Sequence, residues 1–180
     1  MTALPIVMYD DPILREPSRP VVDFDHELRE LIQDLTETMN EHNGAGLAAP
    51  QLGVPLRVFT FSAKIADGAL GHLVNPVLEF PDEEEQDGPE GCLSIPGVYF
   101  DTKRRNNVIA KGYSSHGDPL QIVGSGILAR CIQHETDHLD GVLFLDRVDA
   151  ERRARTLDVI RHGGWLEDAA APAVKISPHA

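Results

Sequence analysis

The sequence predicts an α+β domain, with antiparallel or mixed strands packed around a central helix and further helices toward each end. Apolar residues recur at helical spacing in separate stretches, and four short stretches rich in Val, Ile, Leu and Phe lie between them. Strands and helices do not alternate regularly, as they would in a parallel sheet. The chain has 180 residues, 42% of them hydrophobic. We therefore expect one domain over residues 1–165, followed by a flexible tail over 166–180.

The first predicted helix runs from Asp25 to His42 and ends at Asn43-Gly44. Its apolar positions follow the i, i+3, i+4, i+7 spacing of an amphipathic helix: Leu28, Leu31, Ile32, Leu35 and Met39. The predicted strands come next, and they are LRVFTF (56–61), HLVNPVLEF (72–80), NVIAKGY (107–113) and LQIVG (120–124). The acidic stretch PDEEEQDGPEG (81–91) separates two of them and is predicted to be a solvated loop.

The second predicted helix opens with a stripe of Ile127, Leu128, Cys131 and Ile132 and stops near Gly141. A third helix is predicted from about Ala150 to His162. The second helix contains the stretch QHETDHLDG (133–141) and is the central helix of the predicted fold.

Composition excludes several function classes. The formal net charge of −13 argues against binding of nucleic acid over a broad positive surface, and no sequence-specific nucleic-acid partner is expected. The sequence contains no run of 18 or more apolar residues, the length expected of a membrane span. The start MTALPIVMYDDPILREP lacks the layout of a signal peptide. We therefore expect a cytoplasmic protein. In a reducing compartment, its two cysteines are expected to be buried, catalytic or metal-bound rather than bridged.

The HETDH stretch predicts a metal site. At 3.6 residues per turn, His134 and His138 lie one above the other on one helix face, and Glu135 is adjacent to that face. The pair continues the Ile127/Cys131 stripe, so both imidazoles should point into the protein. Two histidines do not complete a metal site, and a third ligand must come from elsewhere.

Three residues and one motif position are compared for the third ligand. Phe144 stands where the metzincin pattern has its third histidine, which closes that route. Cys131 begins roughly 10 Å from His138 along the helix axis, so it is expected to serve packing. Asp158, twenty residues after His138, stands roughly where a thermolysin-like enzyme has its acidic ligand. Cys92 in PEGCLSIPG offers a thiolate beside a glycine. The residues alone leave Asp158 and Cys92 open.

Three motifs together resemble the peptide deformylase family: GAGLAAPQ (44–51), EGCLS (90–94) and QHETDHLDG (133–141), in that order. The opening PIVMYDDPILR (5–15) is similar to the family's N-terminal segment, and the resemblance covers roughly residues 4–150. It implies that Cys92, His134 and His138 hold a metal ion and that a water takes the fourth position. It also implies that Glu135 is the general acid/base, while the Gln51 amide and the Leu93 backbone N–H bind the developing oxyanion.

The resemblance also implies a cofactor and a substrate. The cofactor is one divalent ion, commonly Fe²⁺, with Zn²⁺, Ni²⁺ or Co²⁺ able to occupy the site. The substrate is the N-formyl group on the initiator methionine of new bacterial or organellar polypeptides. Five residues are expected to contact it: Gly44, Ala45, Gly46, Glu90 and Gly91.

Two rival hypotheses remain at this point. One is a small zinc peptidase that uses His134, His138 and Asp158 as ligands and Glu135 as base. The other is a closed structural site without catalysis, which would need a fourth protein ligand. A separate hypothesis concerns arginines on the third predicted helix, which could contact ribosomal RNA near the emerging chain or simply form a solvated face: Arg152, Arg153, Arg155 and Arg161.

Overall fold

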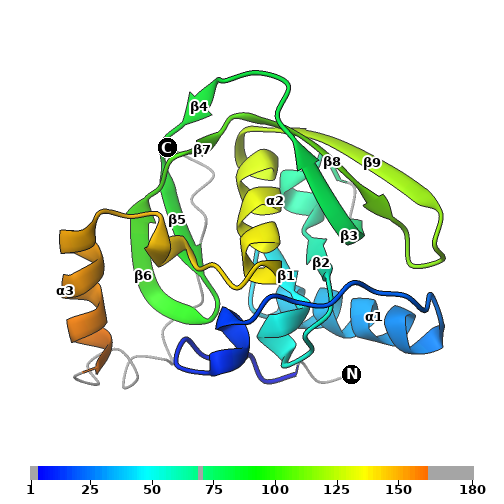
Figure 1. The fold of residues 1–180 in the computed structure, drawn as a ribbon, viewed down its shortest axis with the longest axis horizontal. Coiled ribbons are helices and arrows are strands. Elements are labelled where there is room, and N and C mark those ends of the chain that lie inside the picture. Colours follow the sequence, from blue (N-terminus) through cyan, green and yellow to red (C-terminus); the bar gives the residue numbers. More distant parts are fainter. Residues whose placement is uncertain (1–3, 69–70, 162–180) are drawn as a thin grey trace.

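The computed structural model describes residues 4–68 and 71–161, so the predicted tail over 166–180 lies outside the described residues. Within the described part, the helices are α1 (His26–Glu41), α2 (Gly126–Leu139) and α3 (Ala150–Arg161). Short 3-10 turns lie at Pro12–Arg15, Ala49–Leu52, Ala63–Ile65 and Phe144–Asp146. With the antiparallel sheets described next, these helices confirm the predicted α+β class (Figure 1).

The main sheet has five antiparallel strands in the order β1-β2-β3-β8-β9. Their bounds are β1 Gly46–Ala48, β2 Val58–Phe61, β3 Gly71–Glu79, β8 Asn107–Tyr113 and β9 Pro119–Ser125. The register pairs Phe59 with Leu73 and Val108 with Gly124, which aligns buried positions across the sheet. All four predicted strands are therefore present.

Two small strand pairs complete the fold. β4 (Glu85–Gln86) pairs with β7 (Arg104–Arg105), and β5 (Pro89–Cys92) pairs with β6 (Ile95–Asp101). The prediction that residues 81–91 form a solvated loop is therefore wrong for its second half, because β5 carries the chain inward and buries Glu90. Arginines from other segments neutralise that carboxylate, and no local pattern in the sequence signals them.

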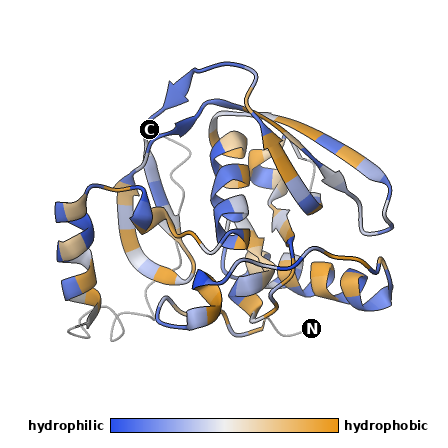
Figure 2. Cartoon of the chain, viewed as in Figure 1, coloured by the Kyte–Doolittle hydropathy of each residue, from blue (hydrophilic) through white to orange (hydrophobic). Residues whose placement is uncertain are grey.

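Helix α1 forms where its sequence pattern predicts. The Asp25 carboxylate accepts a hydrogen bond from the Leu28 N–H at 3.0 Å and caps the helix. Its apolar face, which includes Leu28, Ile32, Leu35 and Met39, packs into a core shared with the sheet. Figure 2 shows apolar and polar residues alternating around this helix.

Helix α2 occupies the centre of the molecule, between the main sheet and the β5–β6 pair (Figure 1). Every residue from Ala129 to Leu139 is buried. The chain leaves α2 at Gly141 with φ of 72°, where a Cβ atom would lie 2.5 Å from the Arg15 carbonyl oxygen. Only glycine fits this turn without strain. In the part of the chain that the structure describes, no helix is both long and apolar enough to cross a membrane.

Candidate metal centre

The structure brings together the three residues that the motifs single out as metal ligands. One ligating atom each from Cys92, His134 and His138 lies within 4.8 Å of the others, and all three residues are buried. The Cys92 Sγ is 3.2 Å from the His138 Nε2. The two histidines come from successive turns of α2, whereas the thiol comes from the end of β5. A thiolate with two imidazoles suits zinc or ferrous iron.

The two competing residues do not join this group. Asp158 is exposed on α3 and is not part of the Cys92, His134 and His138 cluster. Cys131, on α2, is buried in an apolar cluster and lines the small cavity at the site, but its thiol is not part of the Cys92, His134 and His138 cluster. Burial raises the pKa of its thiol well above the ordinary range, and the charges of Glu135 and Glu90 act in the same direction. Cys131 is therefore a neutral packing residue.

Glu90 fixes the orientation of the His134 ring. The His134 Nδ1 donates a hydrogen bond to the Glu90 carboxylate at 2.7 Å, so the Nε2 atom is left to face the cluster. The Phe144 ring packs against the same imidazole, with the ring centroids 6.1 Å apart. Phe144 thus packs against an expected metal ligand, although metzincins have a histidine ligand at its own position.

The Glu90 carboxylate is fully engaged by protein groups. Arg104 binds both of its oxygens, and Arg130 donates to one of them at 3.0 Å. Burial alone would raise the pKa of Glu90, but the hydrogen bonds from His134 and Arg104 bring it well below its usual range. Both oxygens of Glu90 are thus occupied by His134 and two guanidinium groups, and the expected contact of Glu90 with substrate stays a prediction. Arg104 lies in the stretch TKRRNN, which has the composition of a surface loop, so sequence reasoning missed it.

Glu135 lies beside the ligand group with one oxygen unengaged. The residue is 4% exposed, and its Oε2 has no hydrogen-bond partner among the described residues. Burial raises the pKa of this carboxyl to about 7, although the charge of His134 acts in the opposite direction. A Cβ atom at Gly46 would lie 2.5 Å from the Glu135 Oε1, so the glycine gives this carboxylate its room.

The Gln51 side chain is held with its amide N–H groups toward the site. Its Oε1 accepts a hydrogen bond from the Ala48 N–H at 2.9 Å, which fixes which end of the amide faces inward. Its Nε2 donates to the Ser94 Oγ at 3.1 Å and lies 3.6 Å from the Cys92 Sγ. Leu93 follows Cys92 in the turn between β5 and β6. A fixed donor next to the ligand group is suited to stabilise negative charge on a substrate oxygen.

A small cavity of about 30 Å³ joins these groups. Its lining includes every residue predicted to be catalytic or to contact substrate, together with Cys92 and His134. The volume has room for about one or two water-sized molecules. The ligand group found among the described residues has three members, whereas structural zinc sites usually have four protein ligands. The arrangement therefore fits a metal site with an open position better than a closed structural one.

Comparisons with known proteins agree on one family. The model of the polypeptide deformylase family matches residues 3–154. A peptide deformylase of Acidothermus cellulolyticus is 53% identical over 179 residues, covering 99% of this chain and 96% of the relative. A peptide deformylase structure from Legionella pneumophila superposes with a TM-score of 0.84 at 36% identity, covering 92% of this chain and 98% of the other. One from Synechococcus elongatus in complex with actinonin has a TM-score of 0.79 at 40% identity, covering 86% and 84% of the two chains.

Proposed function

Because this chain belongs to the polypeptide deformylase family, we propose that it hydrolyses the N-formyl group from the initiator methionine of newly made polypeptides. The observation that carries the proposal is the cluster of three ligating atoms within 4.8 Å, with the buried Glu135 carboxylate beside it. The family is metal-dependent, and the cluster has donor atoms that a divalent ion prefers.

The proposed ligands are Cys92, His134 and His138, and the proposed native ion is Fe²⁺, with Zn²⁺, Ni²⁺ or Co²⁺ as substitutes. A divalent ion held there would supply Lewis acidity, which makes water a nucleophile near neutral pH. The protein keeps the ligands rigid, since the Glu90 hydrogen bond at 2.7 Å fixes the His134 ring.

Glu135 is the proposed general acid/base. Its unengaged Oε2 can accept the proton from the attacking water, and the same group can then pass that proton to the departing amine. A carboxyl whose pKa lies near 7 can perform both transfers at neutral pH. Burial of the residue also keeps bulk water from competing for the proton.

Gln51 and Leu93 are the proposed donors to the substrate oxygen. The Gln51 amide is oriented by Ala48 and Ser94, so its N–H groups need little rearrangement when charge develops. Backbone groups of the Gly44 to Gly46 segment and of Gly91 line the same cavity and are proposed to contact the peptide. Glu90 is proposed to act on His134.

The proposed partners are formylated nascent chains, and the proposed location is the cytoplasm, where such chains are made. The expected ribosome contact through α3 stays a prediction. Three of its arginines pair with nearby carboxylates: Arg152 with Asp149, Arg153 with Asp146 and Arg155 with Glu151. This pairing reduces the positive charge that the helix offers to RNA.

Formate release from formyl-Met-Ala-Ser tests the function, with the protein loaded with Fe²⁺ under argon. The matched control is acetyl-Met-Ala-Ser, in which a methyl group replaces the formyl hydrogen. We expect formate from the first peptide, little hydrolysis of the second and no cleavage of an unformylated internal peptide bond. A fully metal-loaded protein that releases no formate, or that cuts the internal bond instead, would overturn the proposal.

A further inference from the structure

A chain of ion pairs runs from the protein surface to the metal ligand His134. The guanidinium of Arg147 donates two hydrogen bonds to Asp137, each at 2.6 Å. Asp137 in turn accepts a hydrogen bond from Arg104 at 2.6 Å. Arg104 holds both oxygens of Glu90, and Glu90 holds the His134 Nδ1.

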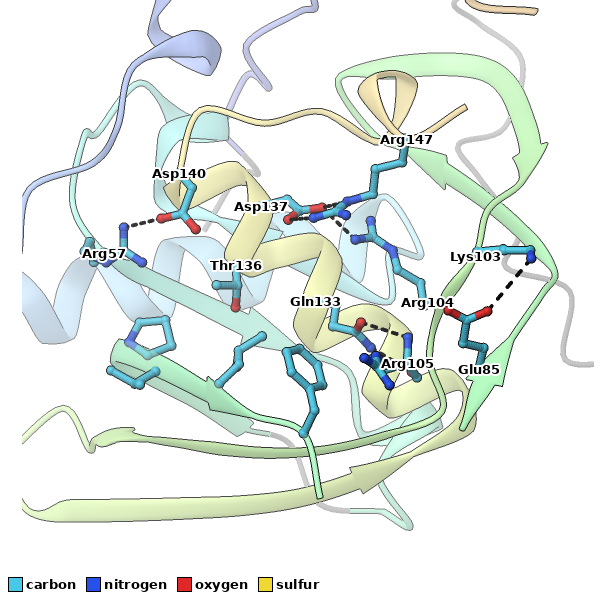
Figure 3. Close-up of a pocket in the computed structure, with 14 residues that line it drawn as sticks. Arg57, Glu85, Lys103, Arg104, Arg105, Gln133, Thr136, Asp137, Asp140 and Arg147 are labelled. Atoms are coloured by element: carbon cyan, nitrogen blue, oxygen red, sulfur yellow. Dashed lines mark hydrogen bonds and ion pairs between the residues drawn. The ribbon is translucent and has the colours of Figure 1, made fainter. Parts of the chain in front are cut away.

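The residues in this series of ion pairs become more buried toward His134. The side chain of Arg147 is 43% exposed and that of Asp137 is 12% exposed, whereas those of Arg104 and Glu90 are each 2% exposed. Figure 3 shows the guanidinium groups of Arg147 and Arg104 both facing the Asp137 carboxylate in a cavity on one face of α2. This cavity has a volume of about 540 Å³ and is distinct from the small one at the metal centre.

The segment that supplies Arg147 also touches His134 directly. Phe144 stands three residues earlier and packs its ring against the imidazole. Asp146, between them, accepts the Leu143 N–H at 2.9 Å and pairs with Arg15 and Arg153, which fixes the turn. The Phe144–Arg147 segment therefore contacts the His134 ring through Phe144. It is also linked to the His134 Nδ1 through the ion pairs of Arg147.

We infer that Asp137 and Arg147 are positioning residues that orient His134 through Arg104 and Glu90. A planar guanidinium has a fixed fork of donors, so a carboxylate on each side fixes its plane. Asp137 occupies one side of Arg104 and Glu90 the other. Arg147 holds Asp137 by two bonds, so it determines where that carboxylate sits. The inference rests on the proposed metal site, but it does not depend on which substrate is hydrolysed.

A neighbouring ion pair offers a matched control. Asp140 caps the C-terminal end of α2, lines the same cavity and pairs with Arg57 at 2.7 Å. Arg57 also donates to the Leu139 carbonyl at 3.1 Å. None of the hydrogen bonds found for this pair joins it to Glu90 or His134. Loss of the pair should affect the cavity without altering the metal ligand.

The experiment uses protein loaded with Co²⁺ and compares Arg147→Gln, Arg147→Lys and Asp140→Asn with the unchanged chain. The readouts are the rate at which a chelator removes Co²⁺, the visible absorption of bound Co²⁺ and the melting temperature of the metal-free chain. We expect Arg147→Gln to speed Co²⁺ loss by about 3-fold to 10-fold, below the roughly 10-fold to 100-fold typical of direct ligand partners. The visible absorption of bound Co²⁺ should shift in Arg147→Gln. Arg147→Lys should show a smaller increase in Co²⁺ loss than Arg147→Gln. Asp140→Asn should match the unchanged chain in absorption and in Co²⁺ release.

Two outcomes separate positioning from simple structural support. If Arg147→Gln lowers the melting temperature but leaves the Co²⁺ spectrum and release rate unchanged, the inference is overturned. Asp137→Asn, where it folds, should change the Co²⁺ spectrum and the Co²⁺ release rate more than Arg147→Gln does. A smaller change in either would also contradict the inference that Arg147 acts on His134 through Asp137. These readouts need no substrate, so a failure of formate release with an intact Co²⁺ response would count against the proposed function alone.

Discussion

Helices α2 and α3 both carry many charged residues, but they satisfy those charges in opposite ways. On α2, Arg130 and Asp137 are buried, and the ion pairs found for them connect to other segments of the chain. On α3, Glu151 and Arg155 pair with each other four residues apart, and their side chains are 74% and 78% exposed. The difference shows which charges the fold depends on.

An exposed charge on α3 stays hydrated, so its ion pair contributes little to the free energy of unfolding and can be replaced. A charge on α2 has lost its water and needs protein partners, so removing one partner leaves the other unpaired. The network on α2 is therefore tied to the metal centre, whereas the exposed Glu151–Arg155 pair lies within α3 and, among the described residues, joins no segment that contacts that centre. The predictions below test this difference.

The comparison would fail at once if α3 supplied the third metal ligand. Cys92→Ala should lose nearly all bound metal and with it nearly all formate release, because two imidazoles alone hold the ion weakly. Asp158→Asn is the matched variant on α3 and should retain both. Metal analysis of the two purified variants decides the matter, and a metal-free Asp158→Asn beside a metal-loaded Cys92→Ala would reverse the ligand assignment.

Glu135→Gln should separate metal binding from turnover. The amide can pack in the same space beside Gly46, but it cannot accept a proton, so the rate should fall by about 100-fold to 10,000-fold. Bound metal should stay near that of the unchanged chain. Rates close to normal on formyl-Met-Ala-Ser, measured at equal metal content, would remove the acid/base role.

Arg104→Gln tests the buried network for stability. It leaves Glu90 and Asp137 without their shared partner, and the loss of one member of a buried ion pair typically costs about 3–5 kcal/mol. The free energy of unfolding in urea, compared with that of the unchanged chain, gives the cost. A loss of under about 1 kcal/mol, the size expected of a surface pair, would erase the contrast between the two helices.

Cys131→Ala should affect packing on α2 but not the metal. The thiol is buried in an apolar cluster, and its removal should cost on the order of 1–2 kcal/mol. Bound metal should be unchanged, because the Cys131 thiol is not among the clustered ligating atoms. Urea unfolding and metal analysis of the same preparation check both parts, and loss of metal here would make Cys131 a ligand candidate again.

Arg155→Gln on α3 should have the smallest effect. Its exposed pair with Glu151 should change the free energy of unfolding by no more than about 0.5 kcal/mol, and metal content should not change. Raising the salt concentration should reduce even this difference, since salt screens exposed charges. An effect as large as that of Arg104→Gln would show that α3 is part of the buried network.

The sequence by itself determined the fold class, the three helices, four of the five strands of the main sheet and the pairing of His134 with His138. These features follow from local spacing, because a helix or strand displays its periodicity within a few turns or residues. The order of the three motifs also indicated the family and singled out Cys92. Reasoning from single residues, however, left Asp158 open as a competing ligand.

Only the tertiary structure decided which distant residues meet. It placed Cys92 beside the histidines and Asp158 on an exposed face, and it buried Glu90 in a stretch whose acidic composition predicts a loop. It also linked Arg147 to His134 through Asp137, Arg104 and Glu90. Such contacts join residues from separate elements, so they depend on how the β5–β6 pair and the Phe144–Arg147 segment pack against α2. No local pattern encodes that packing, because it is set by the burial of the whole core.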